Sequence, residues 1–308
     1  MKYVYGPIPS RRLGKSLGIS PIRKKTCNLS CVYCQLGLTD KMTNNYTDEY
    51  PVEAILSEVK EVVDSKVPMD VITIVGEGEP TLYRYLNDLI DGINSFTEIP
   101  IAVITNGTRF TEVDVYNACL KADIVLPSID AYDEASFKKI NRPHRSLNYD
   151  LIVDSLIRFS HEYQGKLWLE TMICEGYNDS SKAVEGLKTL LKRLKYEKYY
   201  LNSPVRPPAV KSVKPVSHEK MDEIAKILKG INIDMLADPN FFSNISDNYE
   251  AILSIIRRHP MNRFEIQSFL DSRKEKNSDY ILSKLEKNTD IEVINYKTFD
   301  TFRFRMGR

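Results

Sequence analysis

Short apolar segments alternate with longer amphipathic segments from about residue 52 to residue 235, and this alternation constrains the fold most strongly. Apolar residues spaced three and four apart predict helices, and short apolar runs predict buried strands. Strands that alternate with helices indicate an α/β fold with a parallel sheet and right-handed crossovers. The predicted helices cover 52–64, 83–96, 111–121, 149–163, 182–195 and 217–228, and the predicted strands cover 71–75, 101–105, 124–129, 167–173 and 199–202.

Glycine and polar residues gather just after the predicted strands. Gly76–Thr81 follows the first strand, Asn106–Thr108 the second, Ser128–Asp130 the third, and Asn202 ends the last. The carboxyl ends of parallel strands lie at one edge of a sheet, where α/β folds bind ligands. We therefore expect these loops to form a single site.

Three cysteines, Cys27, Cys31 and Cys34, stand close together before the first predicted helix. A structural zinc site closes with four protein ligands, and a four-iron cluster is normally held by four thiolates. No fourth cysteine follows nearby, so the loop indicates a cluster with one iron left open to a ligand that is not protein. The other two cysteines, Cys119 in a predicted helix and Cys174 after a predicted strand, are expected to be buried.

The Cys-x3-Cys-x2-Cys spacing, with the aromatic Tyr33 before the last cysteine, resembles the motif of the radical S-adenosylmethionine (SAM) superfamily. The resemblance implies a partial (β/α)6, TIM-like barrel with a [4Fe–4S] cluster on Cys27, Cys31 and Cys34. It also implies that SAM binds the open iron. An electron from the cluster then breaks a sulfonium–carbon bond of SAM, which gives methionine and a 5′-deoxyadenosyl radical that abstracts a hydrogen atom from a substrate.

The loops after the strands strengthen this resemblance, which covers about residues 20–210. Gly78 and Glu79 match the end of the family's Gly-Gly-Glu segment, although Glu77 replaces the first glycine. Gly78 is expected to let the backbone approach SAM, and the carboxylate of Glu79 to pair with the SAM ammonium group. The segment Thr105-Asn106-Gly107 resembles the family's loop near the SAM ribose, so Asn106 is expected to lie close to that ribose.

Five further side chains are expected to face the cofactor. Ser128 and Asp130 resemble the family's next strand end. Tyr33 either stacks on adenine or packs beside the cluster. Glu170 is expected to point into the barrel, toward the amino-acid or ribose part of SAM. Arg142 either holds the SAM carboxylate or a substrate phosphate, or only helps to end a helix.

All charged residues before Asp40 are basic. One interpretation is a solvated basic tail. The other is a rim that compensates the anionic cluster, or a landing site for an acidic electron donor such as a flavodoxin or ferredoxin. The residues concerned are Lys2, Arg11, Arg12, Lys15, Arg23, Lys24 and Lys25.

Two segments narrow the resemblance to a largely uncharacterised branch that is grouped with wyosine-synthesising tRNA enzymes. These segments are Gly6–Gly14 and Arg206–Ala209. The wyosine enzymes carry additional N-terminal cysteines for a second cluster, and this chain has none before Cys27, so a pyruvate-condensing activity is not expected. Arg206 either recognises an anion or orders the linker that follows the last strand.

The C-terminal part has a different pattern, and we place a domain boundary between 1–240 and 241–308. Three helices, at 248–258, 264–270 and 277–287, precede strands at 291–296 and 301–306 with a turn at 298–300. Asn262 is expected to cap the second helix. This order is typical of a winged-helix-like module. Its basic and acidic residues nearly balance, so nucleic-acid binding, peptide or protein binding and a purely structural lid all remain open.

With 42% apolar and 28% charged residues, the composition is that of a soluble globular protein. No signal peptide and no membrane-spanning run is apparent, so we expect a cytoplasmic enzyme that makes no membrane contact. Its substrate is expected to be a macromolecule, either a tRNA or other nucleic acid or a polypeptide. One alternative is a redox-sensing iron–sulfur protein that binds nucleic acid, which would not need the strand-end residues. A zinc-binding structural module is a further alternative, and it would need a fourth ligand.

Overall fold

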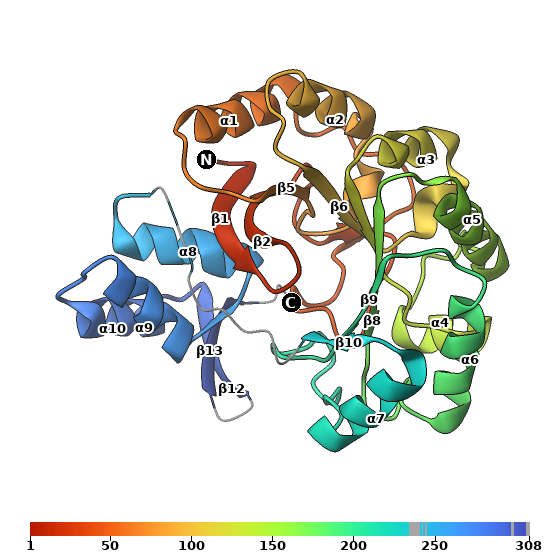
Figure 1. The fold of residues 1–308 in the computed structure, drawn as a ribbon. Helices are drawn as coiled ribbons and strands as arrows, with labels where there is room; N and C mark the ends of the chain where they lie inside the picture. The colour runs from red at the N-terminus through yellow and green to blue at the C-terminus, as the bar shows by residue number, and fades with distance from the viewer. Residues whose placement is uncertain (234–240, 242, 244, 297–298, 306–308) are drawn as a thin grey trace.

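The computed structural model describes residues 1–233, 241, 243, 245–296 and 299–305. A curved sheet runs in the order β1-β2-β5-β6-β7-β8-β9-β10 (Figure 1). From β2 onward neighbouring strands are parallel, whereas β1 pairs with β2 antiparallel. The predicted α/β fold with a parallel sheet is confirmed. The strands are β1 (Val4–Ser10), β2 (Gly14–Ile19), β5 (Val71–Ile74), β6 (Ile101–Thr105), β7 (Ile124–Pro127), β8 (Lys166–Met172), β9 (Lys198–Asn202) and β10 (Ile231–Asn232).

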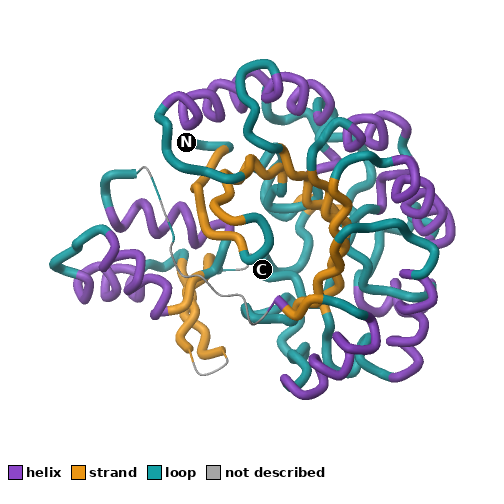
Figure 2. The backbone as a smooth tube through the Cα atoms, in the orientation of Figure 1, coloured by secondary structure: helices purple, strands orange, loops and turns teal. Residues whose placement is uncertain are grey.

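Helices cover the outer, convex face of this sheet (Figure 2). All six predicted helices are present; α1 has the predicted bounds, and the others have ends shifted by a few residues. The structure adds α4, a helix of seven residues that begins with a capping box between Asp133 and Ser136. A helix this short shows too little periodicity to be predicted. The helices are α1 (Val52–Asp64), α2 (Leu86–Asn94), α3 (Val113–Leu120), α4 (Glu134–Ile140), α5 (Tyr149–Glu162), α6 (Ser181–Leu191) and α7 (His218–Leu228).

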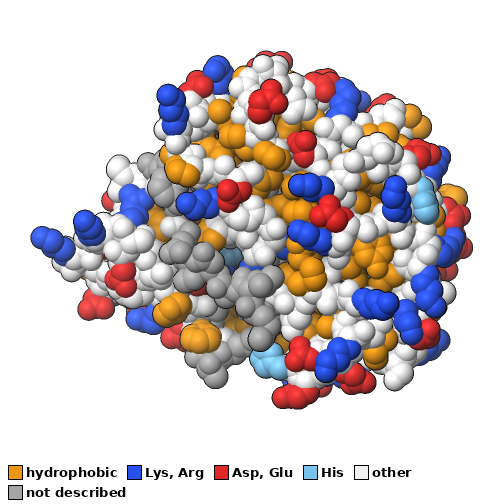
Figure 3. All heavy atoms as spheres, viewed as in Figure 1, with side chains coloured by type: hydrophobic (Ala, Val, Ile, Leu, Met, Phe, Trp, Pro, Cys, Tyr) orange, Lys and Arg blue, Asp and Glu red, His pale blue; other side chains and the backbone are white. Residues whose placement is uncertain are grey.

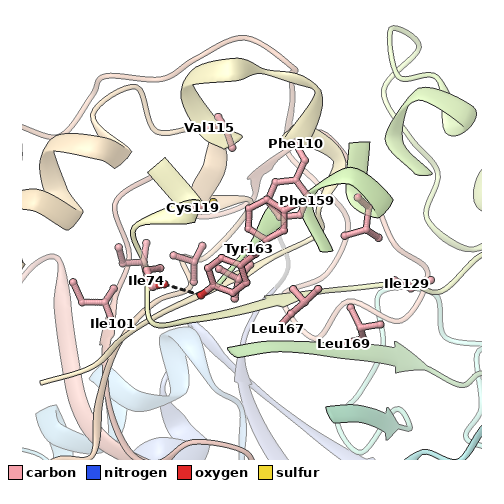
Figure 4. Packing of buried hydrophobic residues seen from close by; sticks show 14 of the residues in the cluster. Ile74, Ile101, Phe110, Val115, Cys119, Ile129, Phe159, Tyr163, Leu167 and Leu169 are labelled. Atoms are coloured by element: carbon pink, nitrogen blue, oxygen red, sulfur yellow. Dashed lines mark hydrogen bonds between the residues drawn. The ribbon is translucent and has the colours of Figure 1, made fainter. Parts of the chain in front are cut away.

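Apolar side chains fill the space between the sheet and these helices (Figure 4). The rings of Phe110 and Phe159 stack with their centroids 4.3 Å apart, and the hydroxyl of Tyr163 donates to the carbonyl of Ala122 at 2.6 Å. Cys119 is fully buried in this layer, as predicted. The packing anchors the strands, and so fixes where their carboxyl ends lie.

The inner, concave face of the sheet has an apolar floor and polar groups above it. Trp168 on β8 and Tyr200 on β9 belong to the floor. Two residues further along the same strands, Glu170 and Asn202 point to the same side, because strand side chains alternate. The side chain of Glu170 therefore points from the inner, concave face of the sheet into the barrel, as expected. Its carboxylate forms an ion pair with Arg12 and accepts a hydrogen bond from the Asn202 amide at 3.4 Å.

The N-terminal segment is a hairpin rather than a basic tail. Arg11 and Arg12 lie in the turn between β1 and β2 and reach the inner face of the sheet. Arg11 donates to the side-chain oxygen of Asn202 at 3.2 Å. Burial, and secondarily Arg11, lowers the pKa of Arg12 to about 10. Lys25 is also buried and pairs with Asp40 at 3.1 Å. The solvated-tail interpretation is therefore wrong for these three residues, because Arg11 and Arg12 have partners on the inner face of the sheet and the side chain of Lys25 is itself buried.

Beyond β10 the chain forms a smaller module with its own apolar core. Its small sheet has the order β11-β13-β12. Asn262 caps the second helix through a capping box with Glu265, as predicted. The predicted turn at 298–300 is wrong, because Phe299 and Asp300 already pair with β12. Residues 298 and 306 lie outside the described residues. The elements are α8 (Asn248–Arg258), β11 (Met261–Asn262), α9 (Arg263–Ser272), α10 (Ser278–Lys287), β12 (Ile291–Tyr296) and β13 (Phe299–Phe304).

This C-terminal module packs against the segment that leaves β9. The hydroxyl of Tyr296 donates to the carbonyl of Pro204 at 2.6 Å. The guanidinium of Arg206 binds both carboxylate oxygens of Glu265 at 2.8 and 2.7 Å and donates to the ring of His259 at 2.7 Å. Arg206 thus orders the linker, as one of its two interpretations predicted. The boundary at residue 240 itself lies among residues that are not described.

None of the helices in the described part of the chain is both long and apolar enough to cross a membrane. The cytoplasmic location stays a prediction.

Candidate active site at the carboxyl ends of the strands

The cysteine loop crosses the carboxyl ends of the parallel strands. It begins in β3 (Thr26–Cys27), which pairs with β4 (Lys41–Met42). The three thiols are free and partly buried. Within the described residues, no three His, Cys, Asp or Glu side chains converge on a point that suits a single metal ion. An iron–sulfur cluster contains more than one iron, so the thiolates that would hold it need not converge on one point.

The chemistry of these thiols fits an iron–sulfur group, whose positively charged iron ions bind thiolates. Burial, followed by Glu79 and the neighbouring Cys31, raises the pKa of Cys27 well above its usual value. Burial and Asp130 raise the pKa of Cys31 to about 12. Burial also raises the pKa of Cys34. Without metal the thiols therefore stay protonated at neutral pH, and thiolates form when a metal centre offsets the cost.

Glu79 holds the loops after β5 and β6 together. Its carboxylate accepts four hydrogen bonds, and burial raises its pKa while these bonds act in the opposite direction. Thr81 donates through its backbone N–H at 3.1 Å and its hydroxyl at 2.6 Å. Thr105 donates through its hydroxyl at 2.6 Å, and Asn106 through its backbone N–H at 2.7 Å. Groups of the chain itself thus already donate hydrogen bonds to both oxygens of this carboxylate.

Gly78 is required by the packing of two loops against each other. A Cβ atom at this position would lie 1.9 Å from the carbonyl oxygen of Thr26. The next residue, Glu79, donates its backbone N–H to that same oxygen at 3.0 Å. The close approach made by Gly78 is therefore to the start of the cysteine loop, a neighbour that the sequence did not reveal.

Asn106 connects the end of β6 to the cysteine loop. Its side-chain amide donates to Asn28 at 2.8 Å and lies 3.8 Å from the sulfur of Cys27. Asn28 is fully buried and in turn donates to the hydroxyl of Thr108 at 2.8 Å. Asn28 lies inside the cysteine motif, where the spacing pattern assigns no role to the intervening residues, so the sequence analysis passed over it.

Asp130 and Tyr33 contact each other beside the cysteines. The Tyr33 hydroxyl donates to one carboxylate oxygen of Asp130, and the other oxygen accepts the backbone N–H of Met172 at 2.9 Å. Both residues line a cavity of about 50 Å³, together with Asn106 and Ser128. The structure thus brings together four of the residues predicted to face the cofactor.

Glu170 and Arg142 are the two remaining residues that were predicted to face the cofactor. Glu170 is level with Ser128, with which it forms an isolated parallel bridge, and it is paired with Arg12 below the strand ends. Arg142 lies in a segment that runs alongside the cysteine loop and has a left-handed backbone, with φ of +47°. Its carbonyl accepts the backbone N–H of Ser30 at 3.2 Å. The backbone of Arg142 therefore contacts the cysteine loop, and its side chain is exposed.

Cys174 is fully buried and packs in the same apolar cluster as the cysteine loop. Burial, followed by Asp130 and Cys31, raises its pKa. It behaves as a small buried side chain, as predicted.

A model of the radical SAM superfamily matches residues 23–185, which include the cysteine loop and the strand-end loops. A UPF0026 protein of Methanocaldococcus jannaschii is 36% identical over 304 residues, which cover 96% of this chain and 94% of that protein. A protein of Brachyspira hyodysenteriae named GTPase Obg is 31% identical over 96% of this chain. The chain spans only 44% of that longer protein.

Among solved structures, peptide-bound SuiB of Streptococcus suis aligns with 70% of this chain and 47% of its own, with a TM-score of 0.54. At 15% identity this likeness concerns the fold. The match to the family model covers more than half of the chain and includes all three clustered cysteines. The chain therefore belongs to the radical SAM superfamily, and also to the UPF0026 family.

Proposed function

We propose that Cys27, Cys31 and Cys34 hold the [4Fe–4S] cluster of this radical SAM enzyme and that the loops after β5, β6 and β7 hold SAM. We further propose that the enzyme abstracts a hydrogen atom from a macromolecular substrate. When bound, the cluster and SAM supply a one-electron cleavage of SAM that generates a 5′-deoxyadenosyl radical.

One observation carries the assignment of the site: residues from three separate strand ends contact the cysteine loop itself. Glu79 of the β5 loop donates its backbone N–H to Thr26 at 3.0 Å. The side chain of Asn106 after β6 lies 3.8 Å from the sulfur of Cys27. Asp130 after β7 accepts the hydroxyl of Tyr33. A structural metal module would not need such contacts, whereas a cofactor that spans the strand ends does.

The chain's own residues have defined tasks in this proposal. The three cysteines bind iron as thiolates. Glu79 and Asp130 fix the loops that border the cofactor, because their carboxylates already accept hydrogen bonds from the chain. The small cavity is lined mostly by apolar side chains, which would keep water away from a cofactor bound beside it. The partial (β/α)6 barrel supports these tasks, because its open strand ends face the cysteine loop.

We infer that the C-terminal module is winged-helix-like and lies close to the substrate. Its element order, α8-β11-α9-α10-β12-β13, supports this inference. The face of its hairpin that carries Tyr296 and Arg303 packs on the barrel linker, through Pro204 at 2.6 Å and Pro207 at 3.2 Å. Helix α10 takes no part in this contact, and its Tyr280 is 69% exposed, so we propose α10 as a surface that a partner can reach.

A tRNA or another nucleic acid is the first candidate substrate. A polypeptide is the second, and the charges on α10 favour it. Its exposed residues include Asp279, Lys284, Glu286 and Lys287, so positive and negative charges alternate. On the face shown in Figure 3, basic and acidic side chains are likewise interspersed. A nucleic-acid-binding helix usually presents an excess of basic side chains.

An acidic electron donor, such as a flavodoxin or ferredoxin, is the proposed redox partner. Arg23 and Lys24 directly precede the cysteine loop and are exposed. Interactions between such exposed charges steer association and weaken with salt.

The test is anaerobic reconstitution with iron and sulfide, followed by incubation with SAM and dithionite. The wild-type chain is expected to form 5′-deoxyadenosine, and Cys31→Ala is expected to form none. Cys119→Ala removes a buried thiol from α3, on the other side of the sheet, and is expected to retain the activity. A wild-type chain with an intact, reducible cluster that forms no 5′-deoxyadenosine would overturn the proposal and favour a redox sensor. Co-purified RNA or peptide, identified by mass spectrometry, then distinguishes the two substrate classes.

A further inference from the structure

Asn141 places its side chain between a carboxylate and a cysteine of the proposed cluster loop. It is the C-cap residue of α4 and is 4% exposed. Its side-chain nitrogen donates to a carboxylate oxygen of Asp130 at 2.7 Å. The same nitrogen lies 3.4 Å from the sulfur of Cys31, within hydrogen-bond distance for sulfur.

The amide of Asn141 has only one orientation that fits both neighbours. An asparagine side chain has two N–H donors on nitrogen and an acceptor on oxygen. The carboxylate of Asp130 requires a donor, so the nitrogen must face it. The second N–H of the same group is then directed at the sulfur of Cys31. This assignment follows from the hydrogen-bond network.

The backbone on either side of Asn141 fixes this position. The carbonyl of Asn141 accepts the N–H of Ser30 at 2.9 Å, and that of Ile140 accepts the N–H of Val32 at 2.9 Å. These bonds bracket Cys31 on its own loop. The next residue, Arg142, has a left-handed backbone that costs of order 1 kcal/mol for a residue other than glycine. The contacts that surround it hold this conformation in place.

A donor at this position has a consequence for an iron–sulfur cluster. Reduction adds negative charge to the cluster and its thiolates. An N–H directed at a ligand sulfur stabilises that charge, so hydrogen bonds to the sulfurs raise the reduction potential. The donor acts more strongly here because the site is buried and water competes little.

We propose that Asn141 is a positioning residue that donates an N–H···S hydrogen bond to Cys31 and raises the reduction potential of the cluster. This inference rests on the proposed function, because it needs Cys31 to be a cluster ligand. No motif of the chain pointed to it: Asn141 and Cys31 are 110 residues apart in the sequence.

The test is a redox titration of the reconstituted enzyme, followed by electron paramagnetic resonance (EPR), after iron and sulfide have been quantified. Asn141→Leu keeps the shape of the side chain but removes both donors. It is expected to lower the midpoint potential while iron and sulfide content stay at the wild-type level. Ser136→Ala is the matched control, because it removes the capping box of the same helix without touching sulfur. Its midpoint potential is expected to equal that of the wild type.

A fully loaded Asn141→Leu enzyme with the wild-type potential would overturn this inference alone. A wild-type chain that binds no four-iron cluster would overturn the proposed function and this inference with it, and the iron content reveals that case first. If Asn141→Leu does not load, pulsed EPR decides the question on the Asn106→Ser variant labelled with ¹⁵N in the asparagine side-chain amides. The amide nitrogen of Asn28 donates to Asn44 and Thr108 and not to sulfur, so a ¹⁵N coupling to the reduced cluster is then expected from Asn141, and its absence would overturn the inference.

Discussion

Arg206, just after β9, and Glu265, on α9, form a two-point ion pair that joins the barrel to the C-terminal module. The two distances are 2.8 and 2.7 Å. The side chains are only 11% and 17% exposed. Glu265 also accepts the backbone N–H of Asn262 at 2.8 Å and so completes the capping box of α9. One carboxylate therefore serves the fold of the module and its attachment.

Glu265→Ala is expected to destabilise the protein by about 3–5 kcal/mol, because it leaves a largely buried guanidinium without its partner. Denaturant unfolding measures the change. Glu286→Ala on α10 is the matched control, since it removes an ion pair with Arg263 whose side chains are about half exposed. Such a pair contributes about 0–1 kcal/mol. Equal effects of the two substitutions would contradict the role assigned to the Arg206–Glu265 pair.

His259 gives this contact a dependence on pH. Burial, followed by Arg206 and Arg11, lowers its pKa well below the usual value. Its ring accepts a hydrogen bond from Arg206 at 2.7 Å and is therefore neutral. Because the folded-state pKa lies below that of the unfolded chain, the unfolded state binds the proton first as the pH falls. His259 thus contributes stability above pH ~6.5 that is lost below it, by up to about 1.4 kcal/mol per pH unit.

His259→Gln is expected to flatten the acid side of the stability profile between pH 6.5 and the folded-state pKa, as measured by denaturant unfolding at several pH values. Glutamine keeps an acceptor for Arg206 but does not titrate. His161→Gln on α5 is the control, because that histidine lies on the surface. A wild-type profile and a His259→Gln profile with the same slope would refute this prediction.

Gly78→Ala is expected to prevent stable loading of iron, because the new methyl group would collide with the carbonyl of Thr26 at 1.9 Å. Neither backbone can give way without moving the cysteine loop. Iron and sulfide content after reconstitution measures the effect. Gly176→Ala is the control: this glycine has a φ of +72° but nothing within 4 Å of an added Cβ. It introduces backbone strain without a collision, and normal iron content is expected.

The repeating parts of the fold were predictable because their signals are local. The helix at 52–64 and the strand at 101–105 were predicted with the bounds that α1 and β6 have. Each has a periodicity that its own residues determine. The cysteine motif and the strand-end residues were predictable for the same reason: each group is contiguous in the sequence.

The side-chain pairings that could not be predicted depend on contacts between segments that are distant in the sequence. Arg12 was interpreted as part of a solvated tail or of a basic rim around the cluster, but it pairs with Glu170 on β8 and is largely buried. Tyr33 was expected either to stack on adenine or to pack beside the cluster, and its hydrogen bond to Asp130, which joins residues 97 positions apart, was not foreseen. Asn141 escaped notice because its two partners are brought together only when α4 folds back along the cysteine loop. Such pairings follow from topology and not from local pattern.

The most direct test of the central claim concerns the open iron of a cluster held by three cysteines. The EPR spectrum of the reduced, reconstituted enzyme should be recorded before and after SAM is added. If SAM binds an iron that no side chain occupies, the g-values of the cluster signal are expected to change, and Glu79→Ala is expected to weaken that change. Identical spectra with and without SAM, from a fully loaded and reduced cluster, would contradict the account.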